Sequence, residues 1–133
     1  RSKYNSIIKI RLADILLLKA EAYVETGNLQ AAAALVNTVR NRAKLADLPA
    51  TTVSSKEKMA DAVLNERRLE LAYEGQRWFD LVRTGKVFSI LNSLNTRDSG
   101  RLPMTPVTEE TVLLPVPQTQ IDKNPNLTQN KGY

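Results

Sequence analysis

Cysteine and histidine are both absent from this sequence of 133 residues. Without cysteine, disulfide bonds and thiol catalysis are excluded, and the redox compartment cannot be inferred. Without histidine, imidazole bases are excluded, and the two absences together remove the usual ligands of zinc and copper. We therefore expect no metal site, no catalytic residue of these types and no cofactor.

Long apolar runs are also missing. The longest run, around residues 15–18, falls far short of the roughly 18 residues that span a bilayer. The net charge is +5, but the densest basic group, Arg40, Arg42 and Lys44, is short and has no aromatic residues interleaved with it. This pattern is typical of a solvated helix face and argues against a nucleic-acid partner.

The chain begins with Arg1 and shows no signal peptide. We therefore expect a piece or a processed form of a protein whose targeting information lies upstream. Residues 1–9 suit either a strand or an incoming arm. The length is that of one ordinary domain with a real hydrophobic core.

Apolar residues at helical spacing predict a first helix over residues 11–26. They are Leu12, Leu16, Ala20 and Tyr23, with Ile15 and Leu18 widening the stripe. The pair Gly27-Asn28 ends this helix, because both residues tolerate the left-handed backbone of a helix C-cap. An alanine-rich second helix follows over residues 29–44.

The spacing of this helical hairpin matches one unit of a tetratricopeptide repeat. The matching positions are Leu16, Ala20, Tyr23, Gly27, Asn28 and Ala32. One such unit cannot bury its faces alone, and no second copy occurs at that period. We expect the hairpin to pack on the rest of this chain, on further sequence, or on both.

A long third helix is predicted over residues 56–82, after a loop at residues 45–55. Ser54 or Ser55 is its expected N-cap, and Gly85 is its stop. A short helix at residues 87–95 follows. Prolines and a glycine then interrupt the chain repeatedly, which predicts an irregular tail over residues 96–133. The expected fold is mostly α: a helical part at residues 10–95 with the proline-rich tail packed on it.

The third helix interleaves charges with two apolar stripes. One stripe contains Leu64, Leu71, Trp78 and Val82, and the other contains Met59, Val63 and Tyr73. A helix that is apolar on more than one side is surrounded by other elements, so some of its charges must be buried and paired. The i,i+3 pairs are Arg67–Glu70, Glu74–Arg77 and Arg77–Asp80. Gly75, in mid-helix, costs about 1 kcal/mol against alanine and suggests a close backbone approach.

The same residues allow a catalytic interpretation. Glu66 with Glu70, or Glu70 with Glu74, could form a glycosidase-like carboxylate pair. Neighbouring arginines, however, lower carboxylate pKa values and disqualify a general acid. Trp78 could stack on a sugar, but its place in an apolar stripe favours a core position. The sequence therefore does not predict an enzyme.

Four segments then invite a comparison with a known family. They are RLADILLLKAEAYVETG (11–27), ALVNTVRNRAKL (34–45), NERRLELAYEGQRWFDLVRTG (65–85) and LLPVPQTQIDKNPNLTQNKGY (113–133). Together they resemble the C-terminal portion of the SusD/RagB family, the outer-membrane nutrient-binding lipoproteins of Bacteroidetes. The segments occur in family order and cover most of the chain. Gln76 and Lys131 stand where the family commonly has His and Pro.

The resemblance implies a binding protein on the cell surface. Family members carry tetratricopeptide-like helices packed on a loop-rich lobe, and they cover a SusC-like TonB-dependent transporter. They capture glycans or peptides for import and are not enzymes. Their membrane attachment is a lipidated cysteine that this chain lacks. Residues 1–133 are therefore expected to be a single C-terminal domain or fragment.

The resemblance assigns no ligand-binding residue, because the family's ligand contacts lie mostly in variable loops. The matched signature motif is expected to be scaffold that locks the long helix to the tail. Its members are Glu66, Arg67, Arg68, Glu70, Gly75, Arg77, Trp78 and Asp80. The loops at residues 94–110 and 45–55 are the places where a ligand surface could vary. The alternatives are a stand-alone helical scaffold that binds a peptide or protein and, more remotely, a hydrolase.

Overall fold

The computed structural model describes residues 9–94 and 106–133. These residues are mostly helical and include no strand, as the sequence predicts. The chain divides into two compact units, one up to Arg77 and one from Trp78 onward. Most of the expected strand or arm at residues 1–9, and residues 95–105 of the expected variable loop, lie outside the described residues.

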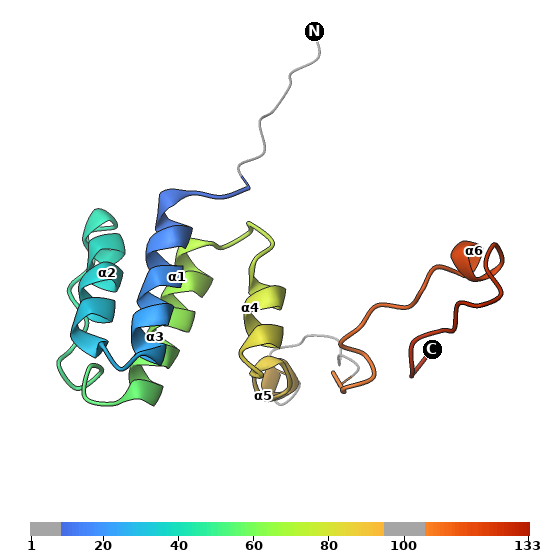
Figure 1. Cartoon of the computed structure of the whole chain (residues 1–133). Coiled ribbons are helices and arrows are strands. Elements are labelled where there is room, and N and C mark those ends of the chain that lie inside the picture. The colour runs from blue at the N-terminus through green and yellow to red at the C-terminus, as the bar shows by residue number, and fades with distance from the viewer. Residues whose placement is uncertain (1–8, 95–105) are drawn as a thin grey trace, which may run out of the picture. The chain divides into compact units, whose positions relative to one another are not determined.

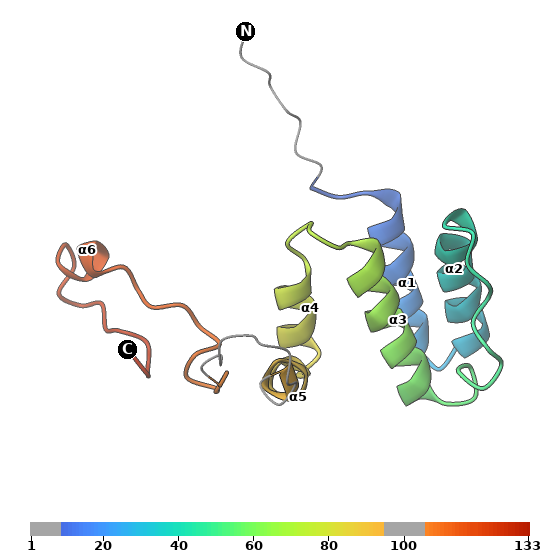
Figure 2. The same ribbon diagram turned by 180° about the vertical axis from the view of Figure 1, so that it is seen from behind.

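Three helices make up the first unit: α1 (Leu12–Glu25), α2 (Leu29–Arg42) and α3 (Lys56–Glu70). Each of them packs on the other two, and Figures 1 and 2 show them side by side from opposite directions. The predicted hairpin of the first two helices is therefore confirmed. It packs on the third helix of the same chain.

Local signals set the ends of these helices. Gly27 adopts φ +80°, and its N–H donates to the carbonyl of Val24, which closes the end of α1. Asn28 both ends α1 and begins α2. Its backbone N–H donates to the carbonyl of Tyr23 at 2.8 Å, and its side chain accepts from the N–H of Ala31. Ser55 is the N-cap of α3, as predicted, and its Oγ accepts from the N–H of Lys58 at 3.2 Å.

The core lies between the three helices. It consists of Leu17, Ala20, Val24, Ala32, Ala33, Val36, Val39, Met59 and Val63. The predicted stripe of α1 is right in part. Ala20 is fully buried, and Leu16 and Tyr23 pack against the core, whereas Leu12, Ile15 and Leu18 face outward, with Leu12 73% and Ile15 49% exposed. The reason is that Asp14 lies on the buried face, where it meets a partner from α3.

The predicted long third helix is broken. It ends at Glu70, a turn occupies residues 71–76, and a separate helix α4 (Arg77–Arg83) follows. Tyr73 and Gly75 adopt φ values of +66° and +77°, which a right-handed helix cannot contain. Gly75 therefore supplies backbone freedom to a turn, and no close backbone approach is needed to explain it.

The second unit contains the rest of α4, the short helix α5 (Val87–Ser93) and the tail. The tail is irregular as predicted, apart from a single helical turn, α6 (Gln118–Ile121). No helix among residues 9–94 and 106–133 combines the length and the apolar character needed to cross a membrane.

Side-chain amides hold the tail in place of strand pairing. The amide of Gln129 accepts from the N–H of Val116 at 2.7 Å and donates to its carbonyl at 2.9 Å. Asn130 donates to the carbonyl of Leu114. These contacts explain why a run broken by prolines keeps a defined path, because each amide satisfies backbone groups that a neighbouring strand would otherwise bind.

The rotation of α1 can be tested with two leucines of the same helix. We expect Leu17→Ala to lower the free energy of unfolding by about 2–5 kcal/mol, because Leu17 is fully buried. The matched variant Leu12→Ala should change it by less than about 0.5 kcal/mol. Urea unfolding followed by circular dichroism measures both. Equal losses would contradict the observed rotation.

Candidate functional site

The signature segment at residues 65–85 contains a buried ion pair. Arg67 on α3 and Asp14 on α1 are only 3% and 8% exposed. A guanidinium nitrogen of Arg67 lies 2.7 Å from the Asp14 carboxylate, and the same nitrogen donates to the Asp14 carbonyl at 3.4 Å. Burying either charge alone is costly, so the pair joins α1 and α3.

A second pair joins α3 to α2. The carboxylate of Glu66 accepts from Arg40 at 2.9 Å, and Glu66 is buried. The Nε of Arg40 also donates to the backbone carbonyl of Ala46 at 2.8 Å. One arginine therefore fixes both the α2–α3 packing and the start of the loop at residues 45–55.

Glu70, at the end of α3, accepts hydrogen bonds from two arginines. Arg42 of α2 lies within 2.6–2.7 Å of its two oxygens, and Arg11 donates to both its carboxylate and its carbonyl. Burial opposes ionisation of Glu70, but the hydrogen bonds from the arginines outweigh it and hold the pKa of the carboxyl below its usual value. The hydrogen bonds that Arg11 donates to Glu74, and then to Glu70, raise the pKa of its guanidinium.

The remaining signature residues act locally. Arg68 hydrogen-bonds Asn65 on its own helix, and Arg77 donates to the carbonyl of Leu64. In the second unit, Asp80 is buried and accepts from Arg83 at 2.7 Å. Trp78 is 38% exposed, so its expected core position is wrong. The broken helix explains this, because the turn resets the rotation of everything after residue 70.

These contacts bear on the catalytic interpretation of the same carboxylates. Glu66, Glu70 and Glu74 each accept from at least one arginine. Those arginines come from α2 and from the residue before α1, whereas the sequence suggested neighbours within the helix. A general acid needs a raised pKa, and that of Glu70 is lowered. Glu66, Glu70 and Glu74 are therefore all engaged in ion pairs with arginines from outside α3. The described residues hold no cluster of acidic side chains that could bind a metal ion.

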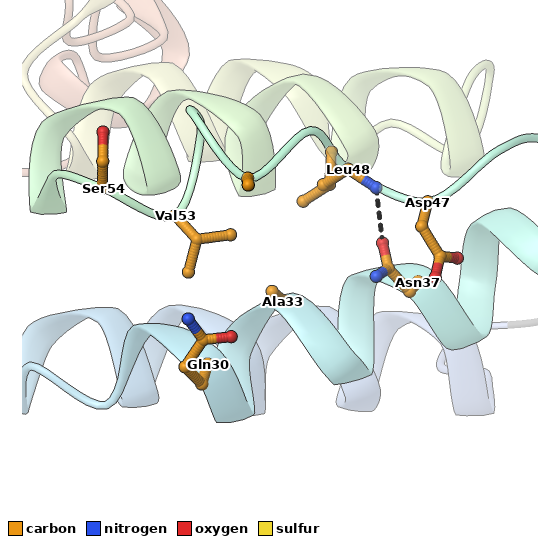
Figure 3. Close-up of a pocket in the computed structure, with 8 residues that line it drawn as sticks. Gln30, Ala33, Asn37, Asp47, Leu48, Val53 and Ser54 are labelled. Atoms are coloured by element: carbon orange, nitrogen blue, oxygen red, sulfur yellow. Dashed lines mark hydrogen bonds between the residues drawn. The ribbon is translucent and has the colours of Figure 1, made fainter.

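A separate open groove of about 350 Å³ lies between α2 and the loop at residues 45–55 (Figure 3). On the helix it is lined by Gln30, Ala33 and Asn37, and on the loop by Asp47, Leu48, Ala50, Val53 and Ser54. Leu48 and Val53 reach from the loop toward Ala33 on the helix. We call this feature the α2–loop groove.

The sequence indicated that this loop could vary, but it predicted no ligand-binding role for any residue of the groove, and Ser54 was expected only as a possible N-cap. The available signal was the spacing of Gln30, Ala33 and Asn37, which places two amides and a small residue on one face of α2. This spacing indicates a groove only once the structure shows that the loop at residues 45–55 lies over the same face of α2 (Figure 3). The carboxylate of Asp47 in the loop carried no signal of its own.

Comparisons with known proteins agree with the helical arrangement. The sequence model of the SusD family matches residues 1–133. A SusD-like protein of Formosa agariphila is 36% identical over 96% of this chain and 25% of its own length. The starch-binding protein SusD of Bacteroides thetaiotaomicron is 32% identical over 92% of this chain and 21% of its own length.

Solved structures show the same relationship. A SusD superfamily protein of Bacteroides vulgatus superimposes with a TM-score of 0.77 at 29% identity, over 94% of this chain and 27% of that one. The surface glycan-binding protein A of Bacteroides thetaiotaomicron gives 0.76 at 28% identity, over 96% of this chain and 25% of that one. The chain thus spans about a quarter of the length of these relatives.

The buried pair generates a first prediction about this segment. Asp14→Ala leaves Arg67 charged and buried without its carboxylate, so we expect the free energy of unfolding to fall by about 3–5 kcal/mol. The matched control is Glu25→Ala, which removes the exposed pair with Lys56 and should cost less than about 1 kcal/mol. Chemical denaturation measures both, and similar small losses would contradict the assigned role.

The lowered pKa of Glu70 generates a prediction about pH. A carboxyl whose folded pKa lies below its ordinary value of 4.5 stabilises the fold above that pH, and its contribution is lost as pH falls through the folded pKa. Wild type should therefore exceed Glu70→Gln in stability by a constant margin at neutral pH. That margin should shrink below about pH 4.5. Urea midpoints measured from pH 3 to pH 7 check this, and a margin independent of pH would contradict it.

Proposed function

Because the chain belongs to the SusD family, we propose that it takes part in nutrient binding at the cell surface, with glycans or oligosaccharides as the ligands. The observation that carries this proposal is the match of the family model to residues 1–133. Two relatives that are named as a starch-binding protein and a surface glycan-binding protein support carbohydrate as the ligand class.

Within that function, this region is mainly scaffold. The signature residues Glu66, Arg67 and Glu70 form the ion pairs that join α3 to α1 and α2. Arg68, Gly75, Arg77, Trp78 and Asp80 complete the proposed scaffold set. The pairing of the carboxylates with arginines supports a binding protein in place of an enzyme, since it suits structural rather than acid–base roles.

The proposed setting is the outer membrane of a Bacteroidetes cell, with the protein exposed on the surface through a lipid anchor outside this chain. The proposed partner is a SusC-like TonB-dependent transporter, and a nucleic-acid partner is not expected. The support for the setting and the transporter is family membership.

A second candidate function is a tetratricopeptide-like scaffold that binds a peptide or protein. The outward apolar residues of α1, Leu12, Ile15 and Leu18, favour it, because an amphipathic groove-binding segment would need such a surface. The two functions differ in ligand class, so a binding panel that includes both sugars and peptides separates them.

The test is an affinity isolation of the tagged protein from outer membranes of the cell that makes it. We expect a TonB-dependent transporter to be recovered with it. The same preparation should bind at least one sugar of a panel of maltoheptaose, cellohexaose, laminarihexaose and chitohexaose, measured by calorimetry. Recovery without a transporter would overturn the proposed partner. Binding of library peptides and of no sugar would favour the second candidate.

A further inference from the structure

The α2–loop groove carries polar groups that the fold itself does not use. The amide of Gln30 and the carboxylate of Asp47 make no hydrogen bond or ion pair within the part of the chain that the structure describes. Asn37 uses only its oxygen, which accepts from the N–H of Leu48 at 2.9 Å. Its NH₂ group remains available among the described residues. These three side chains come from two elements and line one groove.

We propose that the α2–loop groove is a subsite for a neutral sugar unit of an oligosaccharide. This inference rests on the proposed function and gives it a location. A sugar hydroxyl both donates and accepts, so it needs neighbouring groups of both kinds. Asp47 offers two acceptor oxygens, the free amide of Gln30 offers a donor and an acceptor, and the NH₂ of Asn37 offers donors.

The apolar side of the groove suits the carbon–hydrogen face of a sugar ring. Ala33 is buried beneath the groove, and Leu48 and Val53 are half-buried above it. A volume of about 350 Å³ is at the small end of the range for ligand pockets, which fits one or two sugar rings better than a folded partner. No aromatic ring lines the groove, so the affinity of this subsite should be modest.

Hydrogen bonds within the chain fix the loop that forms one side of the groove, so the groove is preformed. Arg40 fixes the carbonyl of Ala46, and Asn37 fixes the N–H of Leu48, so both contacts tie the loop to α2. Turn hydrogen bonds then shape the tip of the loop, from Thr52 to Pro49 and from Val53 to Ala50. A preformed groove avoids the entropy loss of ordering a loop on binding.

The charge of the groove argues against anionic sugars. Asp47 is the one ionisable side chain that lines the groove, and its carboxylate repels a sugar acid or a sulfated sugar. Arg40, the nearby cation on α2, is already occupied by Glu66 and by the loop carbonyl. An anionic ligand would therefore find repulsion without a free compensating charge in the groove.

The test uses the full chain and the sugar panel named above, with the Leu48 amide as a local reporter in ¹⁵N-resolved NMR. We expect a neutral oligosaccharide to shift the amide signals of residues 46–54 and the side-chain amides of Gln30 and Asn37. The double variant Gln30→Ala/Asp47→Ala should bind about tenfold or more weakly, since it removes two hydrogen-bonding groups, one of them charged.

The matched control is Asn41→Ala, which removes an exposed amide of α2 outside the groove and should bind like wild type. Circular dichroism must show equal helix content in all three proteins. Sugar binding that the double variant leaves unchanged would overturn the groove and leave the proposed function standing. Failure of every panel sugar to bind the wild-type chain would overturn the groove, and the carbohydrate part of that function would still be decided by the sugar panel on the protein isolated from outer membranes.

Discussion

Arg67 lies in the interior of the helical unit and cannot remain charged there without a partner. Asp14 supplies that partner with both its carboxylate and its backbone carbonyl. The pair also sets the rotation of α1, because residues three or four positions apart share a helix face. Once Asp14 faces inward, Leu17 and Val24 follow it into the core, and Leu12 must face outward.

A single turn of α3 connects the whole unit. Glu66 faces Arg40 on α2, Arg67 faces Asp14 on α1, and Glu70 meets arginines from both sides. Two acids and one base of this turn therefore each pair with a different part of the unit: Glu66 with α2, Arg67 with α1, and Glu70 with both Arg42 and Arg11. Such a pattern specifies one arrangement of three helices, because sliding any helix by one turn would leave a buried charge unpaired.

The sequence was sufficient to predict the helical class, the α1–α2 hairpin and the cap at Ser55, since these depend on local signals. It was insufficient for the break after Glu70, because Leu64, Leu71 and Trp78 continue the helical spacing across it. The turn needs a left-handed backbone at Tyr73 and at Gly75; the glycine was the one warning in the sequence, and a tyrosine gives none. The rotation of α1 was predictable only in part, because that helix carries apolar residues on several faces and the pairing of Asp14 decides between them. The groove residues could not be predicted for a similar reason, because they lie close together only through the path that the loop at residues 45–55 takes back over α2.

The helix α2 takes part in both the ion pairs and the groove. The loop at residues 45–55 is anchored to α2 through its backbone, and it lines the groove with its side chains. Arg40 and Asn37 hold the loop through a backbone carbonyl and a backbone N–H, so these anchors do not depend on which side chains the loop carries. The exposed side chain of Asp47 can therefore change without loosening the loop or the ion pairs of α3, whereas Val53 also packs against the core. A fold built in this way can alter what its groove recognises while the packing of its three helices stays the same.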